Sequence, residues 1–323
     1  MKSLPVLLLL CLSLRAVADE RPDPVGNRPS LYVSFTMDCE RIGEHCIEGG
    51  PATWDLSERA IRGFCETLLD GGVAPTLFIV PETGEQHPQL FATLAKRGVE
   101  LGMHLHPQCF RDHRYDKYLG EYDAKMQKFL VTEGLAQLTR AIGTTPRAFR
   151  PGNFSASDAT YGILYDLGFR QGSLSDPGRH VPRYHAYWKT ATPHAHWANS
   201  ENRLAAGTLG FFEAPLTTDP NKRRANGFPY ELRIESGSFD EWHRPIIEQS
   251  LARMEADKVE FRVLSIFTHN YFDYSDPANR RTQVLKDYLP YLHQLKDRYL
   301  VRGLTLADIR AEFVKQNGKP AGE

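Results

Sequence analysis

The stretch LYVSFTMDCE, residues 31–40, is a β-rich apolar run that ends in two acidic residues. After it, residues 56–70 place apolar side chains at helical spacing, and Gly71 and Gly72 mark the end of that helix. The stretch therefore predicts a strand followed by a helix, with polar side chains where the strand ends.

The same strand-then-helix order recurs along the chain. Strands are expected at residues 76–80, 99–104, 148–150, 169–174, 211–214, 263–268 and 300–304, and helices at 89–96, 122–142, 158–167, 239–255, 282–295 and after Thr305. Repeated βα units predict a parallel sheet covered by helices. We therefore predict an α/β protein whose residues 31–317 form a single closed or nearly closed (β/α) barrel, TIM-barrel-like, of about seven strands. Residues 177–209 lack periodicity and predict an irregular surface excursion.

Composition and charge narrow the class of protein. The chain has 323 residues, of which 41% are hydrophobic and 24% charged, with a formal net charge of −1. This balance excludes a disordered chain and a polybasic nucleic-acid binder, so no nucleic-acid partner is expected.

The first residues indicate export. Lys2, an apolar run over residues 4–14 and the small residues at 16–18 are typical of a cleaved secretory signal, and an uncleaved anchor is the alternative. We expect residues 1–18 to be the signal, residues 19–30 a lead, and the mature protein to be periplasmic or extracellular. No later stretch is apolar enough to span a bilayer, so no stable membrane insertion is expected after cleavage.

Export would place the cysteines where disulfides persist. The cysteines after the signal are Cys39, Cys46, Cys65 and Cys109. Four cysteines allow three complete pairings, and the sequence does not choose among them. Cys65 lies on the apolar face of its helix, so a buried free thiol is as acceptable there as a disulfide.

Two predicted strands end in residues that bind metals. Asp38 and Glu40 share one side of an extended chain, and so do His104 and His106. Either pair alone is common in solvated loops. Together at the carboxyl ends of neighbouring strands they predict a divalent-metal site, with Zn²⁺ favoured by the histidines.

Two further strand ends add groups that a hydrolase needs. Arg150 ends the strand at 148–150, where it could pair with Asp38 and keep that carboxylate ionised. His269 ends the strand at 263–268, where it could act as a general acid beside a metal.

In this order the segments Thr-Met-Asp-Cys-Glu, Gly-Met-His-Leu-His-Pro, Phe-Arg-Pro-Gly and Phe-Thr-His-Asn resemble the polysaccharide deacetylase family. This family is also called carbohydrate esterase family 4 or the NodB-homology domain, and the resemblance covers about residues 31–309. It implies a distorted (β/α) barrel that removes acetyl groups from N-acetylated sugars with a divalent metal, commonly zinc.

The resemblance also implies roles for individual residues. Asp38 matches the catalytic base, Glu40 the metal-binding acid, Arg150 the arginine that orients the base, and His269 the general acid. The backbone N–H of Asn153 takes the place of the oxyanion donor.

The sequence departs from the family pattern at three points. Its first acids are spaced Asp-x-Glu rather than adjacent, and Asn153 replaces a common aromatic residue. Gln108 stands where the second histidine of the family would fall. His104 is therefore a ligand by resemblance and His106 by strand geometry, and Gln108 or His194 is the alternative to His106.

Other residues are candidates for the substrate cleft. A second His-x-His pair, His194 and His196, could line the groove or supply further metal ligands. Glu213 could point into the same cleft. Nearby aromatic rings could stack on sugar faces, namely Tyr184, Tyr187, Trp188 and Trp197. Local packing is the alternative for each of them.

The sequence thus predicts an exported, metal-dependent hydrolase that removes N-acetyl groups from an envelope or extracellular glycan. Two alternatives stay open: a hydrolase of another non-peptide C–N bond, and an inactive barrel that only binds glycan.

Overall fold

The computed structural model describes residues 28–46, 48–111 and 113–320. The expected signal at 1–18 and most of the lead at 19–30 lie outside these residues. Within the described part of the chain, no helix is long and apolar enough to cross a membrane.

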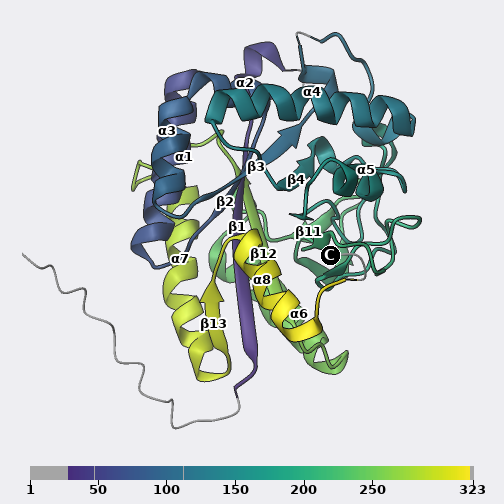
Figure 1. Cartoon of the computed structure of the whole chain (residues 1–323). Coiled ribbons are helices and arrows are strands. Elements are labelled where there is room, and N and C mark those ends of the chain that lie inside the picture. The colour runs from purple at the N-terminus through teal and green to yellow at the C-terminus, as the bar shows by residue number, and fades with distance from the viewer. Residues whose placement is uncertain (1–27, 47, 112, 321–323) are drawn as a thin grey trace, which may run out of the picture.

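Over the described residues, nine strands form one curled sheet (Figure 1). The strands are β1 (Ser30–Cys39), β2 (Thr76–Ile79), β3 (Glu100–Leu105), β4 (Ala148–Pro151), β5 (Gln171–Gly172), β8 (His196–Trp197), β9 (Phe212–Glu213), β12 (Arg262–His269) and β13 (Leu300–Gly303). Their order is β12-β1-β2-β3-β4-β5-β9-β8, and β13 pairs with the first half of β1. All pairs are parallel except β8 with β9.

The α/β prediction is confirmed in its distorted form, a curled half-barrel. The strand expected at 300–304 is present as β13 and shares one side of β1 with β2. The sheet has more strands than the expected seven or so because β8, in the stretch expected to be irregular, adds an antiparallel edge.

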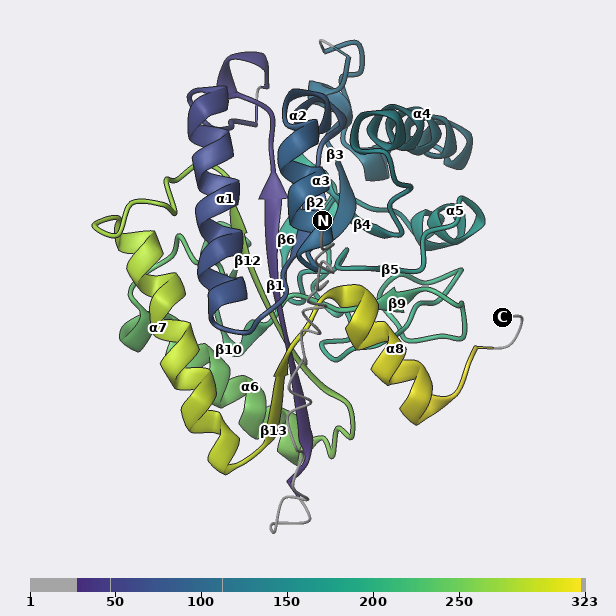
Figure 2. The ribbon, with the colours of Figure 1, turned by 60° about the vertical axis from the view of Figure 1, so that its left-hand side comes forward.

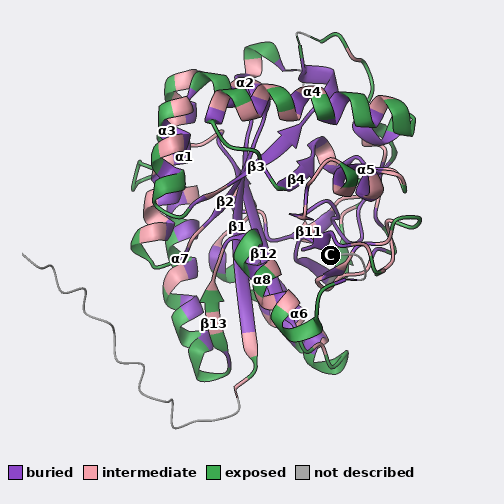
Figure 3. Ribbon diagram, viewed as in Figure 1, coloured by how far each residue is buried: buried purple, intermediate pink, exposed green. Residues whose placement is uncertain are grey.

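Eight α-helices of the described chain surround the sheet (Figure 2). They are α1 (Trp54–Asp70), α2 (Pro81–Gln86), α3 (Pro88–Lys96), α4 (Ala124–Ile142), α5 (Thr160–Asp166), α6 (Arg244–Ala256), α7 (Arg280–Gln294) and α8 (Leu306–Asn317). In α1 the Thr53 side chain caps the first turn by accepting from the Leu56 N–H, and Ile61, Phe64 and Leu68 face the core. Figure 3 shows a similar division for most of the fold, with buried strands inside and exposed helix faces outside, whereas the edge strand β13 is partly exposed.

The excursion at 177–209 is irregular, but it is anchored in the core. It contains the short pair β6 (His180–Val181) and β7 (Ala186–Tyr187), and it is followed by the pair β10 (Thr218–Arg223) and β11 (Pro229–Glu231). Trp188 is fully buried, and its indole N–H donates to the Phe154 carbonyl at 2.7 Å. The excursion therefore does not lie wholly on the surface.

Strand register brings the polar strand ends to one edge of the sheet. Asp38 on β1 is opposite His269 on β12, and His104 on β3 is opposite Arg150 on β4. Because these strands are parallel, their carboxyl ends share that edge, as expected for a (β/α) barrel.

Candidate metal and catalytic site

Three buried side chains converge on one point at this edge. Glu40 Oε1 lies 3.2 Å from His104 Nε2 and 3.0 Å from His106 Nε2, and the two nitrogens are 3.1 Å apart. A tetrahedral ion with bonds of about 2.0–2.1 Å has ligand atoms about 3.3 Å apart. The donor set and its spacing therefore fit one divalent metal ion.

The hydrogen bonds behind the histidines leave Nε2 free for an ion. His104 Nδ1 lies 2.8 Å from the Arg150 carbonyl, which can only accept, so Nδ1 carries the proton. His106 Nδ1 lies 3.3 Å from the Gln108 amide nitrogen, and Gln108 Oε1 is buried with no partner among the described residues. Exchanging the two ends of that amide gives His106 Nδ1–H an acceptor. Gln108 thus supports His106 from behind and does not replace it.

Two residues position the ligands in ways that the sequence analysis missed. Asn270 is fully buried, and its side chain accepts from the Glu40 N–H at 2.9 Å and donates to the Glu40 carbonyl at 3.0 Å. Gly152 packs against His106, since a Cβ at Gly152 would lie 2.4 Å from His106 Nδ1. Asn270 follows a predicted strand end directly, which is the one local signal that could have identified it.

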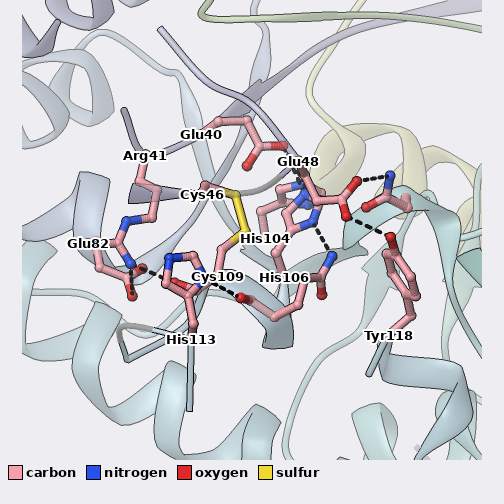
Figure 4. Close-up of a disulfide and its surroundings, with 12 residues drawn as sticks. Glu40, Arg41, Cys46, Glu48, Glu82, His104, His106, Cys109, His113 and Tyr118 are labelled. Carbon is pink, nitrogen blue, oxygen red and sulfur yellow. Dashed lines mark hydrogen bonds and ion pairs between the residues drawn. A yellow bond between two sulfur atoms is a disulfide. The ribbon is translucent and has the colours of Figure 1, made fainter. Parts of the chain in front are cut away.

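A disulfide joins the loops that follow the two ligand-bearing strands (Figure 4). Cys46 lies after Glu40 and Cys109 lies after His106, with 4.9 Å between their Cα atoms. Cys39 and Cys65 are free and buried, and burial is the main cause that raises the pKa of both thiols. The sequence left the pairing of the four cysteines open, and the structure contains one disulfide, Cys46–Cys109.

Asp38 stands beside the triad with one oxygen engaged and one facing the pocket. Arg150, which is fully buried, donates from Nη1 to Asp38 Oδ1 at 2.6 Å, and its guanidinium lies 4.4 Å from the centre of the Phe78 ring. The other oxygen, Oδ2, is 3.9 Å from His104 Nε2 and 3.9 Å from His269 Nε2. Oδ2 therefore lies between the metal ligands and His269.

Glu235 orients His269 and was not identified from the sequence. Its Oε1 accepts from His269 Nδ1 and from the His269 backbone N–H, both at 2.8 Å. Burial alone would raise the pKa of Glu235, but His269 and then Arg233 outweigh it and lower the pKa to about 2. The ionised carboxylate holds Nδ1–H, so Nε2 is turned toward Asp38. Glu235 lies in a loop without periodicity, so no local signal marks it.

These groups line a cavity of about 270 Å³. The described residues around it are Asp38, Glu40, Glu48, His104, His106, Asn153, Phe154, Arg179, Tyr184, Phe228, Arg233, His269 and Tyr271. Asn153 lies at this wall in a left-handed conformation, with φ 54°. Its side chain donates to Glu48 Oε2 at 3.2 Å, and the Tyr118 hydroxyl donates to Glu48 Oε1 at 2.6 Å (Figure 4).

Six residues expected at the cleft are not among the described residues that line this cavity. His194 pairs with Asp257 at 2.9 Å, and His196 Nδ1 lies 2.7 Å from the His194 carbonyl oxygen. Neither histidine joins the metal triad, because the excursion carries both of them to another part of the fold.

Three of the others are buried or half-buried in contact with other parts of the fold. Trp188 is buried under Phe154, as described above, and Trp197 packs with its ring centre 5.0 Å from that of Phe313. Glu213 is fully buried and accepts from the N–H of Leu174 at 2.9 Å. The sixth is Tyr187, whose ring centre lies 5.3 Å from that of His180 and 5.0 Å from that of His185. Of the expected aromatic residues at the cleft, Tyr184 does line the cavity.

A curled α/β half-barrel of this kind is found in several solved structures. A protein from Mycobacterium smegmatis assigned as a polysaccharide deacetylase is 15% identical, with a TM-score of 0.59 over 93% of this chain and 95% of that one. A probable polysaccharide deacetylase from Pseudomonas aeruginosa PAO1 is 17% identical, with a TM-score of 0.59 over 90% of this chain and 93% of that one. Puue allantoinase is 17% identical, with a TM-score of 0.58 over 96% of this chain and 99% of that one.

By sequence, no family model and no curated protein matches the chain. At the identities given above, the structural likeness shows the fold. The chain therefore has the polysaccharide deacetylase fold, and the resemblance drawn from the motifs is confirmed at that level.

Proposed function

We propose that the protein is a divergent polysaccharide deacetylase, a metal-dependent hydrolase that removes N-acetyl groups from a glycan of the cell envelope or the extracellular space. The position of Asp38 Oδ2 carries this proposal. It lies 3.9 Å from a nitrogen of the metal triad and 3.9 Å from His269 Nε2, so a base and an acid face the same small cavity.

Glu40, His104 and His106 would hold the ion, and their two imidazoles and one carboxylate suit Zn²⁺. Bound there, a divalent ion acts as a Lewis acid that lowers the pKa of water and polarises the amide carbonyl.

The side chains of this protein supply the proton transfers. Asp38 takes a proton from the attacking water through Oδ2, while Arg150 fixes the orientation of its carboxylate. His269, oriented by Glu235, gives a proton to the amine nitrogen as the C–N bond breaks. The Asn153 N–H would stabilise the negative charge on the carbonyl oxygen. The products are acetate and a free amine.

The test is acetate release from chito-oligosaccharides by the purified protein, with and without a chelator. Asp38→Asn should lower kcat by about 10²–10⁴-fold, because the general base is lost. Metal content measured on the same sample should be unchanged. Asp257→Asn, which alters an acid paired with His194 outside the cavity, is the matched control. Undiminished activity of Asp38→Asn would overturn the assignment.

Export is part of the proposal. It is supported by the signal-like residues 1–18 and by the Cys46–Cys109 disulfide, since such bonds persist in oxidising compartments.

A second candidate is hydrolysis of another non-peptide C–N bond, which the fold shared with an allantoinase favours. Bound metal without acetate release from any glycan would support this candidate. Absence of metal binding would instead favour a barrel that only binds glycan.

A further inference from the structure

Two arginines that the reaction does not use line the catalytic cavity. The Arg179 side chain is only 2% exposed, and its guanidinium lies 4.6 Å from the centre of the Phe228 ring. The Arg233 side chain is 26% exposed, and its guanidinium lies 4.5 Å from the centre of the Phe267 ring. Phe267 is on β12, the strand that also carries His269. Both positive charges therefore lie at the wall beside the proposed general acid.

Neither guanidinium is fully satisfied within the protein. Arg179 donates from Nη1 to Asp176 Oδ2 at 3.2 Å, and its buried Nε has no acceptor among the described residues. Arg233 donates from Nε to Glu231 Oε1 at 2.7 Å, which leaves its terminal amino groups for a ligand. Buried donors without partners are costly unless a ligand meets them.

The acids behind the two arginines compensate them only in part. Asp176 and Glu231 are buried together, and Asp176 Oδ1 and Glu231 Oε2 each lack a donor among the described residues. Burial, followed by the neighbouring Glu231 charge, raises the pKa of Asp176 well above its usual range. Ionisation of both carboxyl groups at the same time is therefore disfavoured.

The remaining acids of the cavity are engaged elsewhere. Asp38 pairs with Arg150, Glu40 belongs to the triad, and Glu48 accepts from Tyr118 and Asn153. Glu235, which is not among the residues that line the cavity, accepts from His269 Nδ1 and is, with Glu231, one of the two acids nearest to Arg233. Arg233 nevertheless lies at the cavity wall with no partner for its terminal amino groups among the described residues.

We propose that Arg233, with Arg179 behind it, binds a carboxylate of the substrate, so that the substrate is an N-acetylated amino sugar which itself carries a carboxylate. This inference rests on the proposed deacetylase function and narrows its substrate class. The terminal groups of an arginine match a carboxylate in a two-point contact. The contact would place the charged part of the sugar on the side of His269, where the amine leaves.

The experiment compares two substrates that differ only in that charge. The probes are the disaccharide of N-acetylglucosamine and N-acetylmuramic acid, and its methyl ester. The wild-type protein should show a kcat/KM at least about tenfold higher for the acid, because a charge-assisted hydrogen bond is lost in the ester. High salt should reduce this preference.

Variants assign the preference to the arginine. Arg233→Gln should bring the ratio of acid to ester close to one, and Arg233→Lys should keep part of it. Arg244→Gln, an arginine 48% exposed and paired with Asp240, is the matched control and should retain the wild-type ratio. Equal kcat/KM for acid and ester in the wild type, or an intact preference in Arg233→Gln, overturns the proposal.

A binding measurement separates this proposal from the proposed activity. If neither probe releases acetate, calorimetry with Asp38→Asn protein compares binding of the acid and of the ester. Tighter binding of the acid, lost when Arg233→Gln is added, upholds the carboxylate site while the deacetylase activity fails. Equal binding of the acid and the ester overturns the proposed carboxylate site. Equal turnover of both probes supports the deacetylase activity and overturns the carboxylate site.

Discussion

The chain contains two His-x-His pairs, and the structure gives them different environments. His104 and His106 lie at the end of β3, where both Nε2 atoms are within 3.2 Å of Glu40 Oε1. His194 and His196 lie in the excursion, where His194 pairs with Asp257 and His196 lies against the carbonyl of its neighbour. The same short motif therefore belongs to a candidate metal site only where the parallel sheet brings a third side chain, Glu40 after β1, to the same edge.

Strand geometry accounts for the difference. On β3 the period of two residues turns both imidazoles to one side, and the parallel partners of β3 end at the same edge. β8, by contrast, has two residues and pairs antiparallel with β9, so the carboxyl ends of these two strands point apart.

The largest effect should come from removing a ligand of the first pair. His106→Ala should weaken Zn²⁺ binding by at least about 100-fold, since even residues behind the ligands typically contribute 10–100-fold. His194→Ala should leave metal affinity unchanged, because that ring pairs with Asp257 instead. Calorimetric titration of the metal-free proteins with Zn²⁺ measures both affinities. Full affinity in His106→Ala would mean that Glu40 and His104 bind the metal without it.

A smaller effect should come from disturbing the support of His106 while keeping every ligand. Gly152→Ala places a methyl group 2.4 Å from His106 Nδ1, so the ring must shift. Metal affinity should fall about 10–100-fold, as for other residues that orient a ligand. Gly162→Ala is the matched control, because a Cβ there meets no atom within 4 Å and α5 gains a better helix former. Equal metal affinities of the two variants would contradict the role assigned to Gly152.

The smallest effect concerns the second pair and the pH dependence of stability. Burial is the main cause that lowers the pKa of His196 to about 4. In the unfolded chain His196 binds a proton near the ordinary histidine pKa of about 6.5, whereas in the folded protein it does so only near pH 4. The free energy of unfolding therefore falls as pH falls from about 6.5 toward 4. Between pH 7 and 5.5 the wild type should lose about 1 kcal/mol more than His196→Gln in urea unfolding. Parallel pH profiles of the two proteins would show that His196 is protonated equally in both states.

The predictable part of the site is the part that strand geometry fixes. Asp38, Glu40, His104 and His106 follow from the period of two residues and from the common edge of parallel strands. Arg233 reaches the cavity and Glu235 reaches His269 from a loop after β11, and contacts across such distances in sequence leave no local pattern. The expected cleft role of Trp188 did not appear, because its indole ring is buried under Phe154 by the packing of the whole excursion.

The disulfide also acts on the chain before it folds. Cys46 and Cys109 lie shortly after Glu40 and His106, so the bond keeps these ligands near one another even in the unfolded polypeptide. Such a crosslink raises the effective concentration of one ligand around the other. A chain oxidised before it folds would therefore hold its candidate metal ligands close together from the start. If that unfolded chain also bound the metal, the binding would reduce the stability that the metal gives to the folded state.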